Sequence, residues 1–165
     1  MNSTEVYYYL KENVGAKEYR MYKYIHNLEL KFVPKLYSYD KNKKILKTQR
    51  INGLTIADLY GEDFCKVPKR IITQIRAIIK YLYNIGIIYP DITGYNFVQD
   101  KQSRVWIIDF EHCFYTNKYN NQMITNVSYH LNEANANKIT DKDEHLNFVY
   151  GFCFKGQKSW NPYFS

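Results

Sequence analysis

The stretch "IIYPDITGYNFVQDKQSRVWIIDFEHC", residues 87–113, places two carboxylates and a carboxamide among apolar residues that favour strands. These polar residues are Asp91, Asn96 and Asp109, and each follows or ends an apolar extended segment. A carboxylate that is buried without a partner costs free energy, so we expect these groups to face a cation, a substrate proton or one another. The stretch therefore predicts a functional site at the mouth of a small cluster of strands.

The segment before this stretch predicts a long amphipathic helix. In "VPKRIITQIRAIIKYLYNIG", residues 67–86, Pro68 stands where the first turn tolerates proline, and Gly86 stands where the chain must leave the helix. The apolar residues form one stripe, which consists of Ile71, Ile75, Ile78, Ile79 and Leu82. We expect this helix to lie in the core, with the strands packed against it.

The rest of the chain predicts short strands and helices. Tyrosine-rich residues 5–11 favour a strand, and the apolar spacing in residues 16–28 favours a helix. Residues 33–40 and 43–53 predict a hairpin with a polar turn, and residues 55–62 predict a short helix. Residues 96–100 and 104–110 predict a second hairpin, and residues after 114 leave room for one or two short helices.

Length and composition indicate one globular, soluble domain. The chain has 165 residues, of which 45% are hydrophobic, and no linker-like or low-complexity tract divides it. Three scattered cysteines favour a reduced, cytoplasmic protein, and no apolar run reaches the roughly 20 residues that span a bilayer. The net charge of +7 permits an anionic partner without identifying one, and the spread of lysines makes a solvated surface a simpler interpretation than nucleic-acid binding. The spacing of the histidines predicts no zinc site.

The order of Asp91, Asn96 and Asp109 resembles that of the protein kinase-like superfamily, in which a catalytic loop with an aspartate and an asparagine precedes a D-F-G motif across a hairpin. The corresponding stretches here are "YPDITGYN" and "DFE". The resemblance implies an α+β kinase-like fold, with residues 1–53 as a reduced N-terminal lobe and residues 54–165 as a reduced helical C-terminal lobe.

The same resemblance implies roles for the three residues, with ATP and Mg²⁺ as cofactors. Asp91 matches the catalytic aspartate that accepts the proton of the attacking hydroxyl. Asn96 matches the catalytic-loop carboxamide that ligates Mg²⁺, and Asp109 matches the aspartate that joins Mg²⁺ to the nucleotide phosphates. Hard oxygen ligands suit Mg²⁺, and a neutral asparagine supplies one without adding negative charge.

Upstream, the resemblance implies the groups that bind the nucleotide. Lys11 is the candidate for the strand lysine that contacts the phosphates, and Glu18 is the candidate for the helix glutamate that holds it. An alternative for Glu18 is a solvated helix residue that pairs with its neighbours. The segment from Gln49 to Ile51 resembles the hinge whose backbone binds the adenine.

Several positions depart from the family pattern. Only ten residues precede Lys11, so we expect no glycine-rich loop and an open face on the N-terminal lobe. Pro90 replaces the arginine of the catalytic loop, which argues against control by a phosphorylated activation loop. Glu111 replaces the D-F-G glycine, as in small-molecule kinases of the aminoglycoside and choline type, and either joins the metal shell or stands exposed beyond its strand.

Two functions from different classes remain. The first is a Mg²⁺- and ATP-dependent kinase that phosphorylates a hydroxyl of a protein serine or threonine or of a small molecule. The second is a non-catalytic kinase mimic that binds a partner protein through the open N-terminal face. A nucleic-acid binder rests on charge alone, and we expect neither a nucleic-acid nor a membrane partner.

Overall fold

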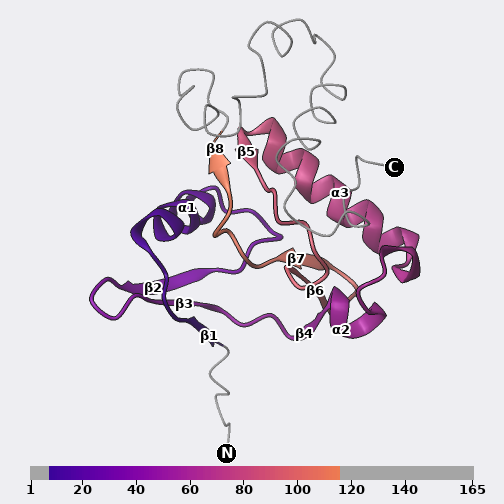
Figure 1. Cartoon of the computed structure of the whole chain (residues 1–165), viewed down its shortest axis with the longest axis horizontal. Helices are drawn as coiled ribbons and strands as arrows, with labels where there is room; N and C mark the ends of the chain where they lie inside the picture. Colours follow the sequence, from indigo (N-terminus) through magenta and orange to yellow (C-terminus); the bar gives the residue numbers. More distant parts are fainter. Residues whose placement is uncertain (1–7, 116–165) are drawn as a thin grey trace, which may run out of the picture.

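The computed structural model of the protein describes residues 8–115, which Figure 1 shows in colour. An N-terminal part combines a three-stranded sheet with one helix, and a C-terminal part packs a long helix with two small sheets. This mixture of helices and small antiparallel sheets is the α+β class that the sequence predicts. The division of residues 1–165 into two lobes at residue 53 stays a prediction, and the helices expected after residue 114 lie outside the described residues.

The N-terminal sheet has the strand order β1-β3-β2 and is antiparallel throughout. Its strands are β1 (Tyr8–Lys11), β2 (Leu36–Asp40) and β3 (Ile45–Gln49). Asp40 shapes the turn between β2 and β3, because its Oδ1 accepts the N–H groups of Asn42 and Lys43 at 2.9 Å each. The predicted hairpin is confirmed.

Helix α1 (Ala16–Asn27) lies over this sheet (Figure 1). Its apolar stripe buries Met21, Tyr22 and Ile25. The ring of Tyr19 stacks on the ring of Tyr39 in β2, with centroids 4.1 Å apart, and thereby ties the helix to the sheet. The predicted helix is confirmed and ends one residue earlier than expected.

The chain passes from the N-terminal sheet to the C-terminal part through residues 50–52. The prediction of one strand over residues 43–53 is wrong at its end, because β3 stops at Gln49 and Gly53 begins a new strand, β4 (Gly53–Thr55). Strand β4 pairs with β6 (Phe97–Asp100), and its backbone approaches β6 so closely that a Cβ on Gly53 would lie 2.0 Å from the carbonyl oxygen of Gln99. Glycine is therefore required at this crossing.

Two short helices follow β4. Thr55 caps α2 (Ile56–Tyr60), because its Oγ1 accepts the N–H of Asp58 at 3.0 Å. The predicted short helix is thereby confirmed. The 3₁₀ helix η1 (Phe64–Lys66) then leads to α3.

Helix α3 (Lys69–Asn84) is the centre of the C-terminal core. All five residues of its predicted stripe are buried, Pro68 stands at the N-cap, and Gly86 leaves the helix with a φ of 89°. Strand β6 forms the predicted second hairpin with β7 (Val105–Ile107), and β5 (Ile87–Ile88) pairs with β8 (Phe114–Tyr115). Among residues 8–115, no helix combines the length and the apolar character needed to cross a bilayer.

Candidate functional site

Lys11 is the centre of a charged cluster that joins the two parts of the chain. Its Nζ donates to Glu18 Oε1 and, at 3.1 Å, to Asp109 Oδ1. Strand β1 supplies the lysine, the first turn of α1 supplies the glutamate, and the segment after β7 supplies the aspartate. The structure therefore brings together the predicted phosphate-binding lysine, its glutamate and the predicted metal-binding aspartate.

Glu18 is the most shielded member of the cluster, and the side chain of Asp109 is 32% exposed. The side chains of Lys11 and Glu18 are 22% and 7% exposed. Burial by itself lowers the pKa of Lys11, but the hydrogen bond to Glu18 and the charge of Asp109 outweigh it, and the pKa lies above its ordinary value of 10.5. The lysine is therefore charged at neutral pH. The alternative of a solvated Glu18 is excluded by its burial.

A second pair lies in the loop between β5 and β6. Asn96 is buried and donates both hydrogens of Nδ2 to Asp91, at 2.8 Å to the backbone carbonyl and at 3.0 Å to Oδ2. Its backbone N–H bonds to the carbonyl of Thr93 at 3.2 Å, which closes the loop into a turn. This turn holds the Asp91 carboxylate in one orientation. Because Nδ2 is fully used, the carbonyl oxygen Oδ1 of Asn96 is the atom left for a ligand.

Backbone and side-chain hydrogen bonds join this loop to the Asp109 segment. The N–H of Ile108 donates to the backbone carbonyl oxygen of Asn96 at 3.1 Å, which leaves the side-chain Oδ1 unaffected. On the other side, the hydroxyl of Tyr22 donates to the carbonyl oxygen of Ile108 at 2.6 Å. The ring of Tyr22 meets Phe110 edge to face, with centroids 4.9 Å apart. Asp109 is therefore held between two anchored neighbours.

Tyr22 is a positioning residue whose role the sequence analysis missed. A tyrosine within the apolar stripe of a helix is the signal that could have found it, because a buried hydroxyl needs a hydrogen-bond partner. Burial raises its pKa well above 10.0, and the carboxylates of Asp109 and Glu18 raise it further. Its hydroxyl therefore stays protonated and keeps donating.

Cys113 is a buried cysteine whose thiol is affected by the predicted acidic residues. Burial raises the pKa of its thiol well above 9.0, and the carboxylates of Asp109, Asp91 and Glu18 add to this effect. These three carboxylates come from α1, from the loop between β5 and β6, and from the segment after β7. The thiol stays protonated, so we assign it no nucleophilic role.

The family assignment follows from the sequence of the whole region that contains these residues. The sequence model of the ABC1 atypical kinase-like domain matches residues 5–142, more than half of the chain. The chain belongs to the ABC1 atypical kinase-like domain family. A search of curated proteins finds no match to it. The predicted kinase-like fold and the resemblance to the protein kinase-like superfamily are confirmed.

Two of the expected nucleotide-binding residues of this ABC1 domain lie where its N-terminal sheet meets the C-terminal part. Gln49 ends β3, and its backbone N–H donates to the carbonyl of Lys35 at 2.7 Å. Ile51 lies in the connecting segment, and its carbonyl accepts the N–H of Gly53 at 3.0 Å. The Gln49 N–H is thus already used within the sheet, and adenine binding by this segment stays a prediction.

Glu111 lies at the edge of the site of the ABC1 domain. Its side chain is exposed, and its backbone N–H donates to Asp109 Oδ1 at 3.0 Å. Burial raises the pKa of Glu18, and the nearby carboxylates of Asp109 and Glu111 raise it further, while Lys11 opposes the shift. Three carboxylates, those of Glu18, Asp109 and Glu111, therefore lie in the region of the Lys11 ammonium.

The side chains of the ABC1 domain fit Mg²⁺ bound together with a nucleotide. Within residues 8–115, no group of three or more His, Cys, Asp or Glu side chains is arranged to hold a metal ion by itself. Mg²⁺ in phosphoryl-transfer sites commonly takes one or two protein oxygens, and phosphates and water supply the others. Asp109 uses Oδ1 for its bonds to Lys11 and Glu111, so Oδ2 and Asn96 Oδ1 are the two oxygens that fit this requirement.

Proposed function

We propose that this ABC1 domain is a Mg²⁺- and ATP-dependent phosphotransferase that transfers the γ-phosphoryl group to a hydroxyl group of a protein or a small molecule. The observation that supports it is that two groups meet at Asp109. The Lys11 ammonium lies 3.1 Å from Asp109 Oδ1, and the loop that contains Asn96 is hydrogen-bonded to Ile108, the residue before Asp109. These groups come from both parts of the chain and have the types that phosphoryl transfer needs.

Each side chain has a role that follows from its contacts. The Lys11 ammonium would bind the nucleotide phosphates, and the Glu18 carboxylate keeps it charged and directed. Asp109 Oδ2 and Asn96 Oδ1 would hold Mg²⁺, which when bound neutralises charge on the phosphate oxygens. The carboxylates of Asp109 and Glu111 beside the pair of Lys11 and Glu18 favour the binding of such a cation.

Asp91 is the proposed base. Asn96 holds its Oδ2 at 3.0 Å, which directs the carboxylate and leaves Oδ1 to accept a hydrogen bond from the acceptor hydroxyl. The hydroxyl proton would move to this carboxylate as the oxygen attacks the γ-phosphorus, while the bond from that phosphorus to the β,γ-bridging oxygen breaks and ADP leaves. The catalysis in this proposal comes mostly from positioning and electrostatic stabilisation.

Calorimetric titration with Mg²⁺ and ATP tests the proposal. We expect binding that requires Mg²⁺ and that falls at least about tenfold in Asp109→Asn, because the variant loses a charged metal ligand. Asp40→Asn is the matched control, because it removes the same charge in the β2–β3 turn and should bind like the wild type. Absence of binding at millimolar nucleotide would overturn autonomous catalysis.

A partner-binding kinase mimic is the second candidate, and the exposed edge of β1 favours it. Tyr8, Tyr9 and Leu10 are 37%, 57% and 48% exposed, and within the described residues β1 pairs on one side alone, with β3. Such an edge can accept a strand from another chain. If the protein binds no nucleotide, a substitution Tyr9→Lys that abolishes partner capture would support this second candidate.

A further inference from the structure

Two adjoining cavities lie beside the segment that joins β3 to β4. Their volumes are about 600 Å³ and 400 Å³, and Gln49 and Trp106 line both of them. Neither cavity is lined by Lys11, Asp91, Asn96 or Asp109. The predicted hinge residues do line them, since Gln49 lines both cavities and Ile51 lines the smaller one. The cavities therefore adjoin the hinge segment without including the Lys11–Asp109 cluster, and each is large enough for a small ligand.

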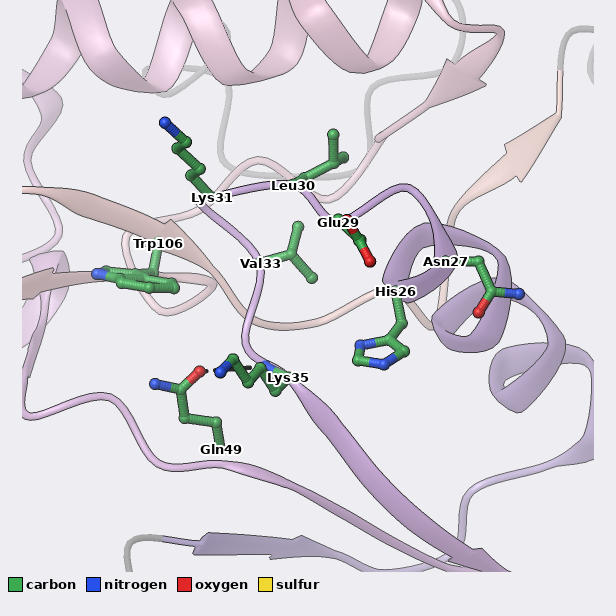
Figure 2. A pocket seen from close by; sticks show the side chains of 9 residues that line it. All are labelled: His26, Asn27, Glu29, Leu30, Lys31, Val33, Lys35, Gln49 and Trp106. Atoms are coloured by element: carbon green, nitrogen blue, oxygen red, sulfur yellow. Dashed lines mark hydrogen bonds between the residues drawn. The ribbon is translucent and has the colours of Figure 1, made fainter.

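The larger cavity, which we call the Trp106 cavity, is lined by apolar Leu30, Val33 and Trp106 together with six polar or charged side chains. Figure 2 shows Val33 in its middle, the flat ring of Trp106 at one side, and His26 and Asn27 at the other. Val33 is buried, and Trp106 is partly exposed. A planar apolar group could thus pack between an indole ring and a valine.

The walls of the two cavities carry an excess of positive charge. Lys31 and Lys35 line the Trp106 cavity, and Arg50 and Lys101 line its neighbour. Within residues 8–115, no carboxylate pairs with any of these four side chains. The acidic residues on the walls are Glu29 and Asp100, and Asp100 is already paired with Arg104 at 2.8 Å.

Neutral hydrogen-bond donors also line the Trp106 cavity. His26 Nδ1 accepts the N–H of Leu36 at 3.1 Å, so the neutral ring carries its hydrogen on Nε2 and has an N–H to donate. Gln49 Oε1 accepts the backbone N–H of Lys35 at 3.2 Å (Figure 2), which orients the amide and leaves its Nε2 amino group to donate. Fixed donors beside unpaired ammonium groups suit the oxygens of an anion.

We propose that the Trp106 cavity binds a small aromatic anion, that is, a flat ring that carries a phosphate or a carboxylate. The ring stacks on Trp106 and covers Val33. The anionic group accepts hydrogen bonds from the Lys35 ammonium and the His26 Nε2–H. Because His26 and Lys35 belong to the N-terminal part and Trp106 to β7, such a ligand would contact both parts of the chain.

Phenyl phosphate is the probe, and Trp106 fluorescence is the readout. The chain has two tryptophans, so Trp160→Phe leaves Trp106 as the single reporter. We expect phenyl phosphate to change this fluorescence in a saturable manner. Phenol, which lacks the anion, and inorganic phosphate, which lacks the ring, should each bind at least about tenfold more weakly, since each keeps one half of the interactions. If Trp160→Phe folds poorly, the same titration is carried out by calorimetry on the wild-type chain.

Matched variants decide where the probe binds. Lys35→Gln should weaken phenyl phosphate about tenfold, whereas Lys41→Gln, which removes an equal charge in the β2–β3 turn, should not change its affinity. Asp109→Asn should also leave it unchanged, because Asp109 lines neither cavity. The proposal is overturned by an absence of saturable binding, by equal effects of the two lysine variants, or by loss of the signal in Asp109→Asn.

Discussion

Lys11 and Asp109 are 98 positions apart in the chain, yet the Lys11 ammonium lies 3.1 Å from the Asp109 carboxylate. The first belongs to the N-terminal sheet, and the second follows the C-terminal hairpin. This bond, with that of Lys11 to Glu18, makes the position of one segment depend on the other. Changes at either end should therefore affect both stability and ligand binding.

Removal of the lysine should expose the cost of a buried carboxylate. Lys11→Met leaves Glu18, which is 7% exposed, without its cationic partner, so the free energy of unfolding should fall by about 2–3 kcal/mol. The double variant Lys11→Met/Glu18→Gln should recover about 1 kcal/mol, because the neutral amide is cheaper to bury. Urea unfolding of the four proteins of this cycle gives the values. A double variant less stable than Lys11→Met would contradict this account.

The same ion pair predicts a loss of stability in alkali. Lys11 has a pKa above 10.5 in the folded chain, despite the opposing effect of burial, because Glu18 and Asp109 favour the ammonium form. Its contribution is therefore complete below pH 10.5 and is lost as the pH rises through the raised value. The difference in unfolding free energy between the wild type and Lys11→Met should be constant between neutral pH and pH 10.5, where Glu18 is ionised, and should shrink above it. A difference that stays constant throughout would show that the lysine is not held this way.

Tyr22→Phe should distinguish the role of the Tyr22 hydroxyl in positioning Asp109 from the role of its ring in packing. The variant keeps the ring against Phe110 but leaves the carbonyl of Ile108 without the hydroxyl, which should cost about 1–2 kcal/mol. It should also weaken Mg²⁺-dependent ATP binding, because Asp109 follows Ile108. Tyr39→Phe is the control, since its hydroxyl donates to the carbonyl of Val14 at 2.7 Å, away from the site. Tyr39→Phe should lower stability without changing ATP binding. If both variants weaken ATP binding equally, Tyr22 does not position Asp109.

Asn96→Asp tests whether stability depends on the two hydrogen bonds that the Asn96 carboxamide donates to Asp91. The substitution replaces the donor Nδ2 by an oxygen that faces the carbonyl and the carboxylate of Asp91, so the chain should lose about 2–3 kcal/mol at neutral pH. The loss should diminish in acid, where the new carboxyl is protonated and can donate again. Asn52→Asp, at an exposed position, should change stability by less than about 0.5 kcal/mol. Thermal unfolding of both variants across the acid range provides the comparison.

Substitutions at two glycines should differ sharply in their effect on the free energy of unfolding. Gly53→Ala would place its Cβ 2.0 Å from the Gln99 carbonyl, so β4 and β6 must separate, at a cost of about 3 kcal/mol. Gly15→Ala places its Cβ in open space at a φ of −74°, and we expect a change within about 1 kcal/mol. Chemical unfolding measures both. A tolerated Gly53→Ala would refute the close crossing.

The elements that the sequence predicts well are those whose signals are local. The stripe of α3 repeats within a few residues, and the Asp40 turn depends on its own neighbours, so both are visible in the sequence. Strand β4 is different, because Gly53 pairs with Asp100, a partner 47 positions away. A strand of three residues without apolar alternation has no local signature that separates it from the end of a hairpin.

The candidate site also combines features that have a local sequence signal with features that depend on distant residues. Asp91, Asn96 and Asp109 could be proposed from one stretch, because family spacing is a local pattern. The pairing of Lys11 with Glu18 could be proposed too, but its contact with Asp109 depends on how the two parts of the chain meet. The role of Tyr22 and the Trp106 cavity likewise depend on side chains that come together from distant segments.

The long separation between Lys11 and Asp109 sets an order of events during synthesis. The three strands of the N-terminal sheet and α1 all lie between residues 8 and 49, so this part has its partners once those residues leave the ribosome. Local contacts form before distant ones. We therefore expect a nascent chain that has not reached residue 109 to form the Lys11–Glu18 pair while it still lacks Asp109, and so to be incapable of the chemistry proposed for the whole chain.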